Sequence, residues 1–139
     1  MDELRLKRYR DKINYIVDKI KDLPKIAKTE LEKDGIFYAI QTSIEAMLDI
    51  IAMIVKDLGI PVKDDVTNIS TIIKKRNIEP KLGEDLHRAN GLRNILVHRY
   101  NRVDEEIVLD SIGDIKGLLF EWLDVIEEVL DELCKPQRS

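Results

Sequence analysis

Hydrophobic residues recur every three or four positions along most of this chain, which is the spacing of one face of an α-helix. The pattern predicts long helices over residues 2–22 and 29–58, from 80 through the segment 92–100, and over 104–133, with one short helix over 68–75. No stretch alternates polar and apolar residues in the manner typical of strands. We therefore expect an all-α fold with residues 1–139 as a single domain, an up-and-down four-helix-type bundle with one short extra helix.

Polar residues and glycines indicate local features of the short predicted helix and of the last one. Thr67 or Asn68 is the expected N-cap of the short helix, because a side-chain oxygen there can accept the first unpaired backbone N–H groups. Asp104 is the expected N-cap of the last helix. Gly113 and Gly117 are four residues apart in that helix, so we expect another helix to pack closely against them.

The second predicted helix is apolar on nearly all sides. Opposite its face of large core residues it carries Ala39, Ala46, Ile50 and Met53. A helix that is apolar all round is buried on both sides. Because a chain of 139 residues offers few internal neighbours, we predict that this helix contributes to a homodimer interface.

Two carboxylates interrupt the apolar stretch 36–55 of this helix. Glu45 and Asp49 are its only charged residues and lie one turn apart. One interpretation places them on a narrow exposed strip between the two apolar faces. The other has them pair with and orient Arg93 or His98, because a carboxylate beside a histidine raises the imidazole pKa and selects its tautomer.

The composition is that of a soluble globular protein of the cytoplasm. Apolar residues make up 44% and charged residues 36% of the chain, and no uninterrupted apolar run is long enough to cross a bilayer. The first residues show no apolar signal region. Cys134 is the single cysteine, which fits a reducing cytosol and excludes an internal disulfide and a cysteine-based zinc site. The net charge of −4 argues against indiscriminate coating of nucleic acid.

Polar residues with chemical potential gather in the segment 92–100, which reads LRNILVHRY. Arg93, Asn94, His98 and Tyr100 are polar, whereas the three residues between Asn94 and His98 are apolar. On a straight helix Arg93 and His98 would lie about 140° apart. They converge only if the helix ends or bends near His98, or if a second subunit brings another copy of the segment.

The charge around this segment opposes that of the whole chain. Residues 86–103 contain four arginines (Arg88, Arg93, Arg99 and Arg102), two histidines and no carboxylate. One interpretation is a cationic helix C-terminus, which the helix dipole favours. The other is a phosphate-binding site, because guanidinium groups hold phosphate oxygens through paired hydrogen bonds.

The pattern R-x-x-x-x-H-x-Y, late in a small helical chain, resembles the HEPN superfamily and in particular the HepT-type toxins. The run Tyr38-Ala39-Ile40-Gln41 and the following Ile44-Glu45-Ala46 resemble that family as well, so the similarity covers nearly the whole chain. The resemblance implies a helical dimer that cleaves RNA without a metal or another cofactor. It also implies that two copies of the motif share one cleft.

Such a reaction requires few groups. A base removes the proton of a ribose 2′-hydroxyl, which attacks the adjacent phosphorus, and an acid protonates the leaving 5′-oxygen. His98 can serve as base or acid near neutral pH, and Arg93 can hold the non-bridging oxygens. Asn94 can orient the phosphate or His98, and Arg99 is a further candidate RNA contact. One histidine is few for two proton transfers, and a symmetric dimer supplies two.

Tyr100 has two candidate roles. It can position RNA by stacking on a base. The resemblance to HepT-type toxins implies another, in which a cognate nucleotidyltransferase antitoxin of the MntA type transfers AMP to the motif tyrosine. The added bulk and negative charge would repel RNA phosphates and silence the site.

Two other functions stay open at this point. HEPN-like bundles also accompany nucleotidyltransferases as non-catalytic helper subunits, in which case the basic segment binds a nucleotide or a partner. The chain could instead be a helical dimerisation adaptor without a site. The joint presence of Arg93, Asn94, His98 and Tyr100 argues against the adaptor.

Overall fold

Six α-helices make up the part of the chain that the computed structural model describes, residues 1–98 and 102–135, and no strand occurs within it. The side chains of residues 102 and 103 also lie outside the description. In chain order the helices are α1 (Glu3–Ile20), α2 (Glu30–Asp57), α3 (Asp65–Lys75), α4 (Pro80–His98), α5 (Arg102–Asp110) and α6 (Ile112–Cys134). The all-α prediction is confirmed.

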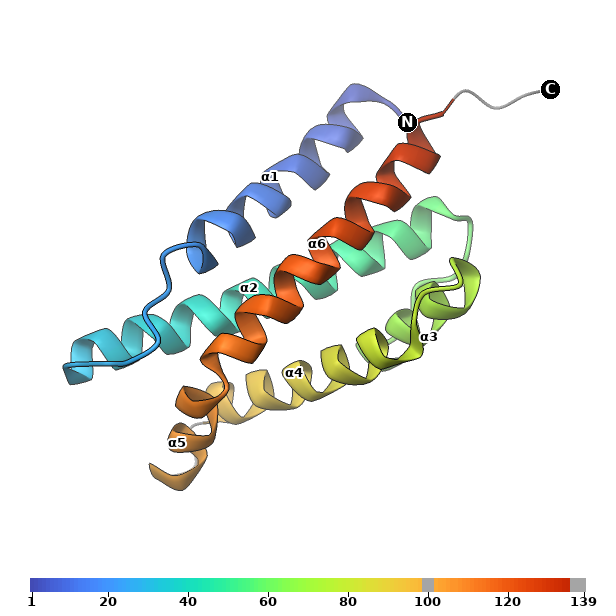
Figure 1. The fold of residues 1–139 in the computed structure, drawn as a ribbon. Helices are drawn as coiled ribbons and strands as arrows, with labels where there is room; N and C mark the ends of the chain where they lie inside the picture. Colours follow the sequence, from blue (N-terminus) through green and yellow to red (C-terminus); the bar gives the residue numbers. More distant parts are fainter. Residues whose placement is uncertain (99–101, 136–139) are drawn as a thin grey trace.

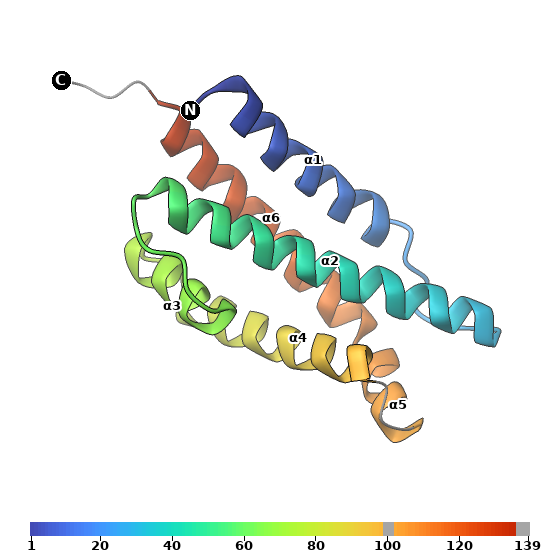
Figure 2. The ribbon, with the colours of Figure 1, turned by 180° about the vertical axis from the view of Figure 1, so that it is seen from behind.

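Four long helices form the bundle, and two short ones cover its ends. Figure 1 shows α1, α2, α4 and α6 running side by side, with the start of α1 and the end of α6 at the same end of the molecule. Seen from behind, in Figure 2, α3 folds back along the first part of α4, and α5 lies beyond its last turn. The short extra helix predicted over 68–75 is therefore α3, and α5 is a second one.

The central helix of the bundle is α2. It packs against α1, α3, α4 and α6 of the same chain, so Ala39, Ala46 and Ile50 are buried without any second subunit. Its apolar character on all sides therefore no longer supports a dimer interface along this helix. By length and composition alone α2 could also cross a membrane, contrary to our expectation for the chain, but 61% of that apolar window is buried inside the bundle.

The last predicted helix is broken in two. Ser111 separates α5 from α6. Its N–H donates a hydrogen bond to the carbonyl of Val108, three residues back, and its hydroxyl donates one of 2.8 Å to the carbonyl of Ile107. A serine hydroxyl that bonds back to the preceding turn weakens the helical ladder. Because α5 already begins at Arg102, Asp104 lies inside its first turn and is not the N-cap that we expected.

The start of α3 also differs from the prediction. Asp64 is the N-cap, and its carboxylate accepts a hydrogen bond of 2.8 Å from the N–H of Thr67. The side chain of Asn68 instead accepts from the N–H of Lys63 at 2.9 Å and donates to its carbonyl at 3.0 Å. The helix therefore begins three residues earlier than we predicted, at Asp65, and the preceding loop is held in place.

Close helix packing occurs at a different glycine from those we expected. A Cβ atom added to Gly113 or Gly117 would meet nothing within 4 Å. One added to Gly83 on α4 would lie 3.0 Å from Cγ1 of Ile73 on α3. A glycine thus lets α3 approach α4 closely.

Candidate active site

The predicted motif lies in the last turns of α4. Pro80 is the first residue of this helix, where the missing N–H of proline costs no hydrogen bond. Leu86, Ala89 and Leu96 face the core and orient the helix. His98 is the last residue of α4 that the structure describes, and the convergence of Arg93 and His98 stays a prediction.

Two residues of the predicted site lie outside the described residues. These are Arg99 and Tyr100, which follow His98 directly. The roles we assigned to them remain predictions.

Arg93 is the half-buried member of the motif. Its side chain is 23% exposed, and Nη2 lies 3.7 Å from Oδ2 of Asp65, the first residue of α3. Its Nε atom is buried and has no hydrogen-bond partner among the described residues. A guanidinium carries five N–H donors in a fixed fork, so this side chain keeps donor capacity for a ligand.

Asn94 and His98 lie on the exposed side of the same helix. They are four residues apart and therefore about 40° apart around the helix axis. The helix thus presents an amide and an imidazole together to solvent, with the guanidinium of Arg93 on the flank that faces α3.

Within the described chain, neither of the two carboxylates of α2 pairs with Arg93. Asp49 is exposed, and its Oδ2 lies 3.4 Å from Nζ of Lys12 on α1. Glu45 accepts a hydrogen bond of 3.2 Å from Gln41, one turn earlier. These contacts favour the interpretation of an exposed strip on α2, and the carboxylate beside Arg93 is Asp65 instead.

Sequence reasoning missed Asp65, although a signal for it was present. We read residues 64–67 as a loop, whereas two consecutive aspartates before Val-Thr-Asn are typical of an N-cap followed by an acidic first turn. A one-dimensional pattern does not indicate which distant arginine such a carboxylate will meet.

In the folded chain, carboxylates from outside the basic segment 86–103 lie near two of its arginines. Besides the Arg93–Asp65 pair, Nη1 of Arg88 lies 3.7 Å from the carboxylate of Asp85, which also pairs with Lys81. Arg88 is largely exposed. Among the described residues, no group of three or more His, Cys, Asp or Glu side chains could hold a metal ion.

Two more polar side chains on α4 place buried atoms on the flank near Arg93. Nδ1 of His87 and Oδ1 of Asn90 are buried without a hydrogen-bond partner in the described structure. Asn90 lies about 60° around the helix axis from each of His87 and Arg93, so it is a neighbour of both, whereas His87 and Arg93 are about 120° apart. Sequence reasoning considered His87 only as a distant second histidine.

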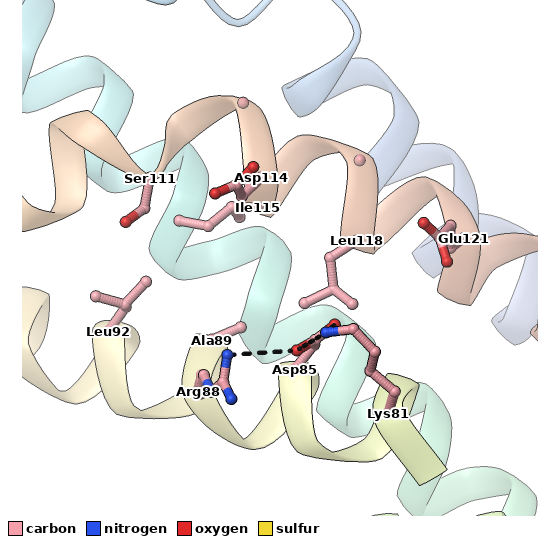
Figure 3. A pocket seen from close by; sticks show the side chains of 12 residues that line it. Lys81, Asp85, Arg88, Ala89, Leu92, Ser111, Asp114, Ile115, Leu118 and Glu121 are labelled. Carbon is pink, nitrogen blue, oxygen red and sulfur yellow. Dashed lines mark hydrogen bonds and ion pairs between the residues drawn. The ribbon is translucent and has the colours of Figure 1, made fainter. Parts of the chain in front are cut away.

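A groove of about 600 Å³ lies between α4 and α6, away from the motif. Figure 3 shows Asp85 between Lys81 and Arg88 on one wall, with Leu118 on the facing helix. The backbones of Gly113 and Gly117 form part of the opposite wall. Neither Arg93 nor His98 lines this groove.

Comparison with known proteins gives consistent results. Residues 6–129 match the family model described as ribonuclease HepT-like. A protein of Archaeoglobus fulgidus, provisionally assigned as an RNase, is 46% identical over 130 residues, which are 94% of this chain and 98% of that protein. A protein of Methanocaldococcus jannaschii with the same provisional assignment is 36% identical over 73 residues, 52% of this chain and 84% of its own length.

Solved structures share the fold. A chain from the crystal structure of a MntA–HepT toxin–antitoxin with a tyrosine-to-alanine mutation superposes with a TM-score of 0.76 at 22% identity, covering 87% of this chain and 98% of its own. A chain from the tri-AMPylated Shewanella oneidensis HEPN toxin in complex with MNT antitoxin gives a TM-score of 0.68 at 23% identity, covering 92% and 99%.

Proposed function

Because this chain belongs to the HepT-like ribonuclease family of the HEPN superfamily, we propose that it is the endoribonuclease toxin of a type VII-like toxin–antitoxin pair. The observation that carries the proposal lies in the last described turns of α4, where a half-buried arginine, whose Nε has no partner among the described residues, comes five positions before an exposed histidine. These are the groups that phosphodiester cleavage requires, a cation for the developing charge and a group that moves protons near neutral pH.

In the proposed reaction the 2′-oxygen of a ribose forms a bond to phosphorus while the bond from phosphorus to the 5′-oxygen breaks. One His98 takes the proton from the 2′-hydroxyl, and a second His98 gives a proton to the leaving oxygen. Arg93 donates to the non-bridging oxygens as their charge grows. The products are a 2′,3′-cyclic phosphate and a free 5′-hydroxyl, and no metal takes part.

Two histidines in one cleft require a homodimer that brings two α4 ends together. The exposure of Asn94 and His98 supports this arrangement, because a second copy can reach both side chains. Exposed apolar residues on the same helix and its neighbours, Val97, Val66 and Tyr38, offer surface for such a contact. In this proposal the dimer forms around the end of α4 rather than along α2.

We also propose that a MntA-type nucleotidyltransferase antitoxin silences the toxin by transferring AMP to Tyr100, two residues after His98. The AMPylated HEPN toxin among the structural relatives supports this regulation. A phosphate group next to His98 would repel the RNA backbone. Both proteins would act in the cytoplasm.

The first test is incubation of the purified chain with single-stranded RNA in EDTA, beside His98→Ala. We expect cleavage by the wild type, with cyclic phosphate ends, and none by the mutant. If the wild type leaves RNA intact, the intact mass tells whether Tyr100 carries AMP, which would mean a silenced toxin. An unmodified, dimeric and inactive chain would favour the non-catalytic helper subunit instead.

A further inference from the structure

The Arg93–Asp65 pair joins the motif to α3, a helix to which the proposed function assigns no role. The two residues are 28 positions apart in the sequence, yet Nη2 and Oδ2 approach to 3.7 Å. The side chain of Asp65 is 41% exposed, and that of Arg93 is 23% exposed.

The fold holds Asp65 in this place by three independent contacts. Asp64 caps the helix directly before it, and the side chain of Asn68, 3% exposed, bonds both backbone groups of Lys63 in the preceding loop. At the other end of α3, Ile73 packs against the bare backbone of Gly83. Because both ends of α3 are anchored, its first residue has little freedom to move relative to α4.

We propose that Asp65 is a positioning residue for Arg93: the carboxylate attracts the guanidinium toward α3 and so favours the orientation in which the other Nη N–H groups reach the RNA phosphate. This inference rests on the proposed function. Groups that orient a functional side chain through a hydrogen bond or ion pair typically change activity by about ten- to hundredfold when removed. A side chain with several rotatable bonds gains most from such support.

A different role for Asp65 would be to compete with the phosphate for Arg93. The geometry favours positioning, because a separation of 3.7 Å is longer than a hydrogen bond and the buried Nε of the same guanidinium is not engaged. A carboxylate that blocked the site would be expected to hold two N–H groups at once. The two roles predict opposite changes in RNA cleavage.

The test compares Asp65→Asn with Asp64→Asn, which removes the same charge one residue earlier and retains a side chain able to cap α3. Cleavage is measured in EDTA, and binding is measured with RNA that lacks the 2′-hydroxyl at the cleaved position. We expect Asp65→Asn to lower kcat about ten- to hundredfold without weakening RNA binding. Asp65→Glu should recover part of the loss, and Asp64→Asn should stay close to the wild type.

A double mutant at Asp65 and Arg93 distinguishes a positioning role of Asp65 from a general effect on the structure. In an Arg93→Ala background, Asp65→Asn should cause no further loss of cleavage, because there is no guanidinium left to orient. An equal loss in both backgrounds, or wild-type cleavage by Asp65→Asn, would overturn the proposal. Faster cleavage by Asp65→Asn would identify the carboxylate as a competitor of phosphate.

A readout without RNA keeps this inference distinct from the proposed function. The ¹⁵N-labelled Nε–H signal of Arg93, assigned by its disappearance in Arg93→Lys, reports the side chain's environment and mobility. We expect Asp65→Asn to shift and narrow this signal and Asp64→Asn to leave it unchanged. A wild type that carries no AMP and does not cleave RNA would refute the proposed function, whereas an unshifted signal would refute the role of Asp65.

Discussion

Among the described residues, two arginine–aspartate pairs connect neighbouring helices, and they differ in how completely the arginine is engaged. Between α1 and α2, Nε of Arg5 donates to Oδ2 of Asp57 at 3.0 Å, and Nη2 of Arg5 donates to the carbonyl of Met53 at 3.3 Å. The hydroxyl of Tyr9 donates to the same carboxylate oxygen at 2.5 Å. This pair is a closed network.

Between α3 and α4, the Arg93–Asp65 pair is open. The atoms lie 3.7 Å apart, and Nε is buried without a partner in the described chain. The two arginines are similarly exposed, at 19% and 23% of their side chains, so burial does not explain the difference. A satisfied pair stabilises the fold, whereas an arginine with unused donors is suited to bind an anion.

The largest expected effect comes from removing the open arginine. Arg93→Ala should lower RNA cleavage by about 10²–10³-fold, the usual consequence of losing a donor to the transition state. The free energy of unfolding of this variant should differ from that of the wild type by only about 1 kcal/mol or less, because the Arg93–Asp65 pair is long and partly solvated. Cleavage assays and urea titrations measure the two quantities. If Arg93→Ala lost much stability and still cleaved RNA normally, Arg93 would be a structural residue and the contrast with the Arg5–Asp57 pair would be wrong.

An intermediate effect is expected from opening the closed network. Asp57→Ala leaves Arg5 and the hydroxyl of Tyr9 without their shared acceptor, which should lower the free energy of unfolding by about 2–3 kcal/mol. RNA cleavage by the folded protein should stay at the wild-type rate. Urea titration of Asp57→Ala is compared with that of Asp85→Asn, which removes a surface ion pair and should lower the free energy of unfolding by under about 1 kcal/mol. Equal losses of stability in the two variants would contradict the distinction between a closed network and a surface ion pair.

The smallest expected effect is a pH dependence confined to alkaline solution. Burial of Tyr9, together with its hydrogen bond to Asp57, raises the pKa of its phenol above the ordinary value of 10.0. The folded state therefore keeps a proton that the unfolded chain loses above that pH, so stability should fall as pH rises beyond it. Tyr9→Phe cannot titrate and should lack this component. If the stability of the wild type and of Tyr9→Phe fell equally with rising pH, Tyr9 would not be the group responsible.

The open pair also shows how far sequence reasoning reached. The helical spacing predicted α1, α2 and the start of α4 to within a few residues. Arg93 and His98 could be proposed as site residues because the motif is contiguous in the chain. Asp65 was not, because ion pairs between distant residues depend on how α3 packs against α4.

The sequence by itself determined the all-helical class and the family and supplied the candidate motif, because periodicity and short-range motifs are written along one dimension. The tertiary structure alone decided that both apolar faces of α2 are covered within one chain, that Ser111 divides the last helix, and that Asp65 rather than Glu45 or Asp49 meets Arg93. Periodicity states which side of a helix is apolar. It does not state which neighbour covers that side, since this depends on the packing of the whole bundle.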